Sequence, residues 1–113
     1  MPRGGEERAR RAYFAGLLGL AELEKELDKP LALTGRGGVW FTLPDGRRLH
    51  LGVEEPFRPS AKAHPAFGGG ALDGLAWRLD ESDCAVRWDE ELAPKRRFYG
   101  EDPFCHRVEF IEP

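Results

Sequence analysis

A strand–turn–strand pattern that occurs twice constrains the fold of this chain more than any other feature. Residues 97–111 predict two strands joined by a tight turn at Asp102 and Pro103. Residues 38–43 and 48–53 predict the same arrangement, with a Pro–Asp–Gly turn between them. Because a duplicated unit of this length is an internal repeat, we expect two similar halves within one fold.

Aligning the two copies pairs one ligand-type residue in each half. When residues 46–51 are placed on residues 105–110, His50 falls on Glu109. On an extended strand, the apolar neighbours of each of these residues point to the opposite face. Each half therefore presents a lone imidazole or carboxylate on one face of its predicted sheet.

Each half also contains a stripe of apolar residues at helical spacing. The stripe residues are Ala9, Ala12, Tyr13, Gly16, Leu17 and Leu20 in the first half, and Leu72, Leu75, Ala76 and Leu79 in the second. A predicted strand follows each helix, at residues 21–26 and 85–88, and Pro56 and Pro59 stiffen the segment between the halves. The sequence therefore predicts an α+β fold. Its predicted parts are module one (1–53), a linker (54–63) and module two (64–113).

The composition is that of a compact domain with no excess of positive charge. The 113 residues are enough for one domain with a modest core. A formal net charge of −3 argues against nucleic acid as the main partner. No apolar run approaches the roughly 20 residues that span a bilayer, and the charged N-terminus does not resemble a secretory signal. We therefore expect a cytoplasmic protein with no membrane partner, in which Cys84 and Cys105 are reduced thiols.

The order of several motifs resembles that of a known superfamily. The motifs are Arg36-Gly37-Gly38-Val39-Trp40-Phe41, Leu49-His50-Leu51-Gly52-Val53-Glu54-Glu55-Pro56-Phe57, Lys62-Ala63-His64-Pro65-Ala66-Phe67, and Asp102-Pro103-Phe104 followed by Arg107-Val108-Glu109-Phe110. Together they resemble a bacterial single-domain branch of the vicinal oxygen chelate superfamily, which contains glyoxalase I, the bleomycin-resistance proteins and the extradiol dioxygenases. The resemblance implies two βαβββ modules that form a curled mixed sheet around a cavity.

In metal-using members of that superfamily, the ligands of a divalent ion come from the first and last strands of each module. Three of these four places match His64 on the first strand of module two, Glu109 on its last strand and His50 on the last strand of module one. Two histidines and a carboxylate form a facial triad that suits Fe, Mn, Ni or Zn, so the resemblance implies a divalent metal ion of unassigned identity. The alternative is that the histidines are hydrogen-bonded core or rim residues rather than ligands.

The fourth ligand place has no match in the sequence. The residue that precedes His50 by as many positions as His64 precedes Glu109 is Gly5. It lies in a Gly-rich segment that predicts neither a strand nor a ligand. We therefore expect the first strand of module one to be missing. An open sheet edge is normally covered, which predicts a symmetric homodimer.

Two classes of function follow from the resemblance. The first is a metal-dependent lyase, isomerase or dioxygenase that acts on a small substrate with vicinal oxygens, in which Glu109 moves a proton. The second is a metal-free protein that binds a small-molecule ligand, as in the drug-sequestering bleomycin-resistance branch. Strand alternation places Trp40, Thr42 and Tyr99 in the cavity, with core packing as the alternative for Trp40. Cys105 lies in a turn where the family usually has Gly–Asn, and we expect it to be a thiol at the rim.

Overall fold

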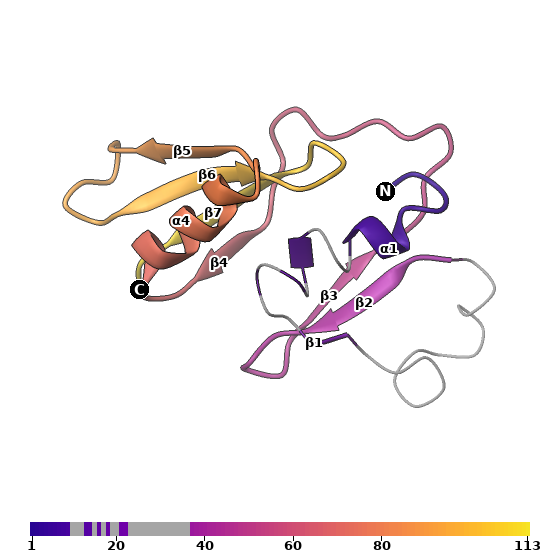
Figure 1. The fold of residues 1–113 in the computed structure, drawn as a ribbon, viewed down its shortest axis with the longest axis horizontal. Helices are drawn as coiled ribbons and strands as arrows, with labels where there is room; N and C mark the ends of the chain where they lie inside the picture. The colour runs from indigo at the N-terminus through magenta and orange to yellow at the C-terminus, as the bar shows by residue number, and fades with distance from the viewer. Residues whose placement is uncertain (10–12, 15, 17, 19–20, 23–36) are drawn as a thin grey trace. The chain divides into compact units, whose positions relative to one another are not determined.

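The computed structural model describes residues 1–9, 13, 14, 16, 18, 21, 22 and 37–113 (Figure 1). The contacts between these residues divide the chain into two compact units, Met1–Arg58 (unit 1) and Pro59–Pro113 (unit 2). The predicted module boundaries at residues 53 and 64 stay a prediction.

Unit 1 contains a short helix and an antiparallel sheet. The helix α1 spans Glu6–Ala9. The sheet has the strand order β1-β2-β3 and is formed by β1 (Ala21–Glu22), β2 (Val39–Thr42) and β3 (Arg48–Leu51). Strand β2 buries Val39 and Phe41, and Phe41 packs against Phe14 with ring centroids 5.4 Å apart. Trp40 and Thr42 therefore lie on the opposite face of β2.

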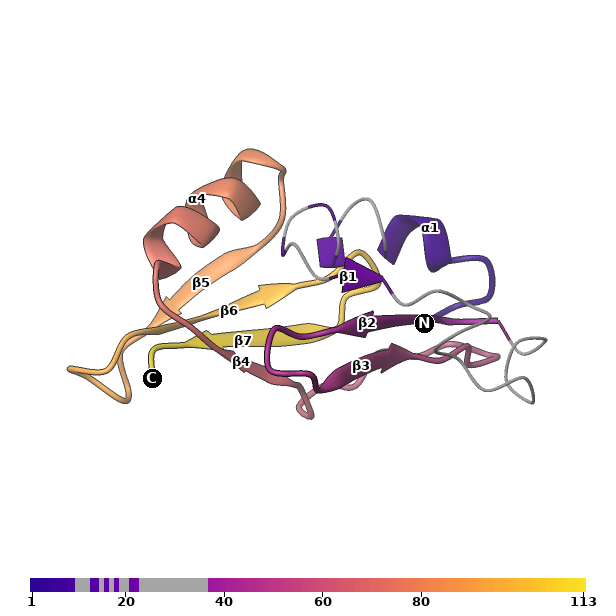
Figure 2. The ribbon, with the colours of Figure 1, turned by 90° about the horizontal axis from the view of Figure 1, so that it is seen from below.

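Unit 2 has the βαβββ order that the repeat predicts. Its elements are β4 (Ala66–Gly68), α4 (Leu72–Glu81), β5 (Val86–Asp89), β6 (Arg97–Glu101) and β7 (Arg107–Ile111). In the sheet order β4-β7-β6-β5, β4 runs parallel to β7 and the other neighbours are antiparallel. Figure 2 shows α4 over one face of this sheet. The predicted α+β class is thus confirmed, and the described strands form two sheets.

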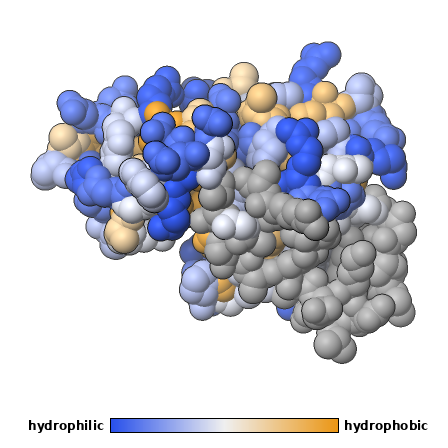
Figure 3. Space-filling model, viewed as in Figure 1, coloured by the Kyte–Doolittle hydropathy of each residue, from blue (hydrophilic) through white to orange (hydrophobic). Residues whose placement is uncertain are grey.

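The core of unit 2 is formed by the apolar stripe of α4 and the apolar residues of β6 and β7. Its buried residues include Leu72, Ala76, Leu79, Phe98, Val108 and Phe110. The rings of Phe98 and Phe110 stack with centroids 4.9 Å apart. Outside this core, hydrophilic side chains cover most of the face of unit 2 that Figure 3 shows. Nowhere in the described ranges is a helix long and apolar enough to cross a membrane.

The two hairpins of the repeat have the same strand register. In unit 1, Trp40 is paired with His50 across β2 and β3. In unit 2, Tyr99 is paired with Glu109 across β6 and β7. All four pairs of the first hairpin recur in the second at one constant offset in residue number. The predicted alignment of the two hairpins is therefore confirmed by their backbone pairing.

The two hairpin turns are also built alike. In unit 1, Gly46 has a φ of 89° and donates its N–H to the carbonyl of Leu43 at 3.0 Å. In unit 2, Cys105 has a φ of 67° and donates its N–H to the carbonyl of Asp102 at 3.1 Å. Cys105 therefore occupies a left-handed position that favours glycine.

Unit 1 has no described counterpart of β4. The amino group of Met1 donates to the carbonyl of Gly52 at 2.7 Å. In unit 2, Gly69 at the end of β4 donates to the carbonyl of Ile111 at 3.0 Å, which is the equivalent bond at the end of the other hairpin. Met1 thus takes the place of Gly69, and residues 1–5 form no strand. This confirms, for the described residues, the predicted absence of a first strand in module one.

Some predicted elements lie partly outside the described residues. In the predicted first helix, residues 6–9 form α1, and Ala9 and Tyr13 are buried as expected. Gly16, another predicted stripe position, is instead exposed in a turn, and positions 12, 17 and 20 lie outside the description. In the predicted strand at 21–26, the first two residues form β1, and the other four lie outside. The strand predicted at 85–88 spans Val86–Asp89.

Candidate functional site

A polar network lies on the face of the unit 2 sheet opposite α4. Strand alternation turns Phe98, Val108 and Phe110 toward the helix and turns Arg97, Tyr99 and Glu109 to the other face. Glu109 keeps only 8% of its surface exposed, although its side chain is a carboxylate. A buried carboxylate requires compensating partners, and the network supplies them.

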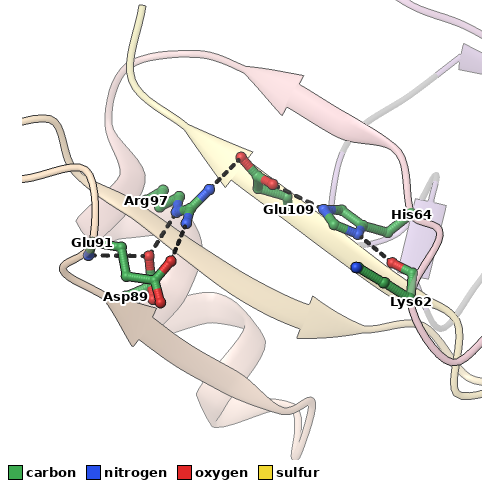
Figure 4. A network of polar contacts seen from close by, with 6 residues as sticks. All are labelled: Lys62, His64, Asp89, Glu91, Arg97 and Glu109. Carbon is green, nitrogen blue, oxygen red and sulfur yellow. Dashed lines mark hydrogen bonds and ion pairs between the residues drawn. The ribbon is translucent and has the colours of Figure 1, made fainter.

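Figure 4 shows the network as a chain of contacts that runs from β5 to the segment before β4. Asp89 Oδ2 accepts a hydrogen bond from Arg97 Nε at 2.7 Å. Arg97 Nη1 lies 3.5 Å from Glu109 Oε2. Glu109 Oε1 lies 2.9 Å from His64 Nε2, and His64 Nδ1 lies 2.8 Å from the carbonyl oxygen of Lys62. Each oxygen of Glu109 therefore has a nitrogen beside it, from a different strand or loop.

Both ring nitrogens of His64 face oxygen acceptors. A carbonyl oxygen only accepts hydrogen bonds, so the Lys62 carbonyl requires a proton on His64 Nδ1. In a neutral imidazole, Nε2 then carries a lone pair that points at the Glu109 carboxylate, which is a repulsive contact. A proton or a metal cation at Nε2 removes this repulsion. An Nδ1–H bond to a backbone carbonyl is also the usual way in which proteins orient a metal-ligating histidine, so the His64–Glu109 donor set fits a divalent cation.

Arg97 and Asp89 are parts of the site that the sequence analysis did not identify. The side chain of Arg97 is 12% exposed, and its contacts to Asp89, Glu91 and Glu109 surround the guanidinium with acids. The hydrogen bond to Asp89 is the main reason why the pKa of Arg97 is raised. The sequence contained one signal for Arg97, because it lies two residues before Tyr99 and so shares its face of β6.

Tyr99 lies beside the His64–Glu109 pair. It is the cross-strand partner of Glu109, and its ring meets the His64 ring edge-on at 5.4 Å with an interplanar angle of 84°. The structure thus brings three residues of the predicted site together within unit 2.

The other predicted site residues belong to unit 1. His50 is exposed on β3 and stacks on Trp40 of β2, with ring centroids 3.6 Å apart and an interplanar angle of 10°. Thr42 shares that face of β2, and its Oγ1 is buried with no hydrogen-bond partner among the described residues. The convergence of His50 with His64 and Glu109 stays a prediction. Within the described ranges, no three His, Cys, Asp or Glu side chains group closely enough to hold a metal ion.

His106 and Asp102 have a structural role in the second hairpin turn. Asp102 Oδ1 accepts hydrogen bonds from the backbone N–H groups of Phe104 and His106, both at 2.9 Å. Asp102 Oδ2 lies 2.5 Å from His106 Nδ1. Cys105 between them is an exposed thiol. These contacts stabilise the turn, and the candidate ligands His64 and Glu109 lie in the polar network instead.

A surface cavity of about 480 Å³ lies elsewhere in unit 2. Its walls include Asp73 of α4, Trp88 of β5 and Arg96 of the following loop, but neither His64 nor Glu109. Arg96 fills part of this region, because its guanidinium lies 4.5 Å from the centre of the Trp88 ring and bonds both carboxylate oxygens of Asp73 at 2.8 Å. Asp89 lines this cavity and also bonds Arg97, so the cavity adjoins the β5 end of the polar network but does not include the His64–Glu109 pair.

Similar solved structures share this fold over nearly the whole chain. A glyoxalase family protein from Bacillus anthracis is 38% identical, with a TM-score of 0.86 over 99% of this chain and 87% of that one. A glyoxalase/dioxygenase from Nostoc punctiforme is 25% identical, with a TM-score of 0.75 over 94% and 82% of the two chains. An antibiotic binding protein from a Streptomyces species shares the fold, with a TM-score of 0.72 and 21% identity over 100% and 90%.

No protein-family model and no curated protein matches the sequence. The assignment rests on the likeness to the Bacillus anthracis protein, which extends over most of both chains. This chain belongs to the glyoxalase family of the vicinal oxygen chelate superfamily.

Proposed function

We propose that the protein is a divalent-metal-dependent lyase, isomerase or dioxygenase that acts on a small substrate with vicinal oxygens. The observation that carries this proposal is the position of His64, whose Nε2 faces the Glu109 carboxylate while its Nδ1 faces a backbone carbonyl. In the proposal, His64 and Glu109 hold the ion and His50 is the third ligand. Iron, manganese, nickel or zinc would supply Lewis-acid polarisation of the substrate oxygens when bound.

In this proposal, Glu109, Arg97 and Tyr99 have separate roles beside the metal ion. Glu109 takes a proton from the substrate and returns it, as a general base and acid, since it is a carboxylate held in a largely buried position. Arg97 beside Glu109 Oε2 stabilises the ionised carboxylate and fixes its orientation. The Tyr99 ring packs against His64 and limits its rotation.

Calorimetric titration with Mn²⁺, Fe²⁺, Ni²⁺ and Zn²⁺ tests the proposal. We expect the wild-type protein to bind at least one of these ions, and His64→Ala and Glu109→Gln to lose that binding while circular dichroism shows an unchanged fold. Glu81→Gln is the matched control, because it removes an exposed carboxylate at the end of α4 and should leave binding unchanged. Wild-type affinity in Glu109→Gln would refute the assignment of the ligands.

The second candidate is a metal-free protein that binds a small molecule. It is favoured by the likeness of the fold to an antibiotic binding protein from a Streptomyces species. If the wild-type protein binds none of the four ions, this candidate replaces the enzyme.

A further inference from the structure

Three guanidinium groups surround the ring of Tyr99. The central carbon of Arg87 lies 5.5 Å from the centroid of the ring, and those of Arg97 and Arg107 each lie 5.2 Å from it. The arginines come from three adjacent strands, β5, β6 and β7. Arg87 is the cross-strand partner of Tyr99, and Arg107 lies two residues before Glu109, so all three share the face of the sheet that carries the polar network.

Among the residues that the structure describes, acids pair with one of these arginines. Arg97 forms ion pairs with Asp89, Glu91 and Glu109. Neither Arg87 nor Arg107 forms an ion pair within the described part of the chain, although Glu101 is the cross-strand partner of Arg107. Arg87 is exposed and Arg107 is half-buried, so both can be reached from solvent.

Each of these two guanidiniums lies against the ring without a described acid beside it, and an anion bound to either of them would supply the missing counter-charge. A guanidinium is the side chain best suited to this role, because its planar donors match the oxygens of a carboxylate or a phosphoryl group. The Tyr99 ring holds both groups by cation–π contacts, which orders them before a ligand arrives. An anionic group bound there would lie next to His64, which contacts the same ring.

We propose that Arg87 and Arg107 form an anion-binding subsite around Tyr99, and that the substrate is a small acid whose charged group is a carboxylate or a phosphorus oxyanion. This inference rests on the proposed function, which places the vicinal oxygens of the substrate at the His64–Glu109 pair. The subsite itself consists of residues that need no metal ion in order to bind an anion.

Binding of simple aromatic anions to the full chain tests the subsite. The probes are phenylphosphonate and benzoate, with benzamide as the uncharged analogue, measured by calorimetry in metal-free buffer. We expect the two anions to bind and benzamide to bind more weakly by about tenfold or more. The affinity for the anions should fall when NaCl is raised from about 0.05 to about 0.5 M, because the contacts are partly exposed.

The double variant Arg87→Gln/Arg107→Gln should weaken phenylphosphonate binding by about tenfold or more. Arg78→Gln is the matched control, since it removes one exposed guanidinium from α4 and should bind as the wild type does. Equal binding of benzamide and benzoate, or wild-type binding of phenylphosphonate by the double variant, would overturn the proposal.

The same preparations separate this inference from the proposed function. If the double variant loses the anion but still binds metal ions, the subsite is supported independently of the metal site. If the wild-type protein binds phenylphosphonate and no metal ion, the subsite stands and the enzyme proposal fails. If it binds metal ions but no anion, the subsite fails alone.

Discussion

At the scale of single residues, each member of the His64–Glu109 pair is oriented by a neighbour. The Lys62 carbonyl oxygen lies at His64 Nδ1, and the Arg97 guanidinium lies beside Glu109 Oε2. Both side chains therefore have a fixed direction before any ligand binds, which lowers the entropy lost on binding. This preorganisation distinguishes the pair from a chance surface contact.

Cys105 carries a conformational cost that a single substitution can remove. Its φ of 67° lies in the left-handed region, and the equivalent turn residue in unit 1 is Gly46. We expect Cys105→Gly to raise the free energy of unfolding by about 0.5–1 kcal/mol, because the gain in the turn exceeds the entropy that glycine adds to the unfolded chain. Urea unfolding measures this change. Cys105→Ala keeps a Cβ and should give no gain, so equal stability of the two variants would contradict the account.

Gly38 occupies a position at the start of β2 that admits no side chain. A Cβ there would lie 2.7 Å from the carbonyl oxygen of Leu51, and the φ of the residue is 92°. We expect Gly38→Ala to lower the free energy of unfolding by about 2 kcal/mol or more. At Gly52 a Cβ meets nothing within 4 Å, so Gly52→Ala should change stability by about 0.5 kcal/mol or less. Similar losses in both variants would contradict the close approach of Gly38 to β3.

At the scale of elements, the hairpins are the parts that the sequence predicts best. Turn residues and apolar alternation are local signals, and they specify the register in which Trp40 pairs with His50 and Tyr99 with Glu109. The contact of Arg97 with Glu109 is not predictable in this way. A guanidinium on a long flexible stem can reach several acids, and the choice depends on where β5 brings Asp89.

The loop between β5 and β6 is joined to α4 by an ion pair whose effect depends on pH. The hydrogen bond from Arg96 is the main cause that lowers the pKa of Asp73 from its usual value of 3.8. A lowered folded-state pKa stabilises the fold at pH values above 3.8, and this contribution disappears as the pH falls through the lower folded-state value.

We therefore expect Arg96→Gln to raise the pKa of Asp73 toward 3.8, as followed by carbon NMR of its carboxyl group. Lys95→Gln is the control, because Lys95 is an exposed neighbouring cation whose ammonium forms no ion pair with Asp73. An unchanged titration of Asp73 in Arg96→Gln would show that the pair does not form in solution.

At the scale of the whole molecule, assembly stays a prediction from the sequence. A homodimer is expected because the described residues of module one form no first strand and sheet edges are usually covered. Light scattering at about 50 μM, where dimers with a Kd below about 10 μM dominate, should give twice the mass of the 12.7 kDa chain. A monomer mass at that concentration would refute the homodimer.

For the function of the whole molecule, the sequence predicts the superfamily but not the substrate. The motifs around His50, His64 and Glu109 were sufficient to indicate the superfamily, and the likeness to solved structures confirms it. In our proposal the substrate depends on Arg87, which no motif includes, and on Arg107, to which its motif assigned no role. Their importance appears only when the strands bring them around one ring.

The central claim is that His64 and Glu109 bind a divalent metal ion, and anomalous diffraction from crystals grown with Mn²⁺ or Zn²⁺ tests it most directly. The account predicts an anomalous peak about 2.0–2.2 Å from His64 Nε2 and within coordination distance of a Glu109 oxygen, with His50 as the third protein ligand. A peak that touches neither His64 nor Glu109, or no peak in crystals soaked at saturating metal concentration, would contradict it.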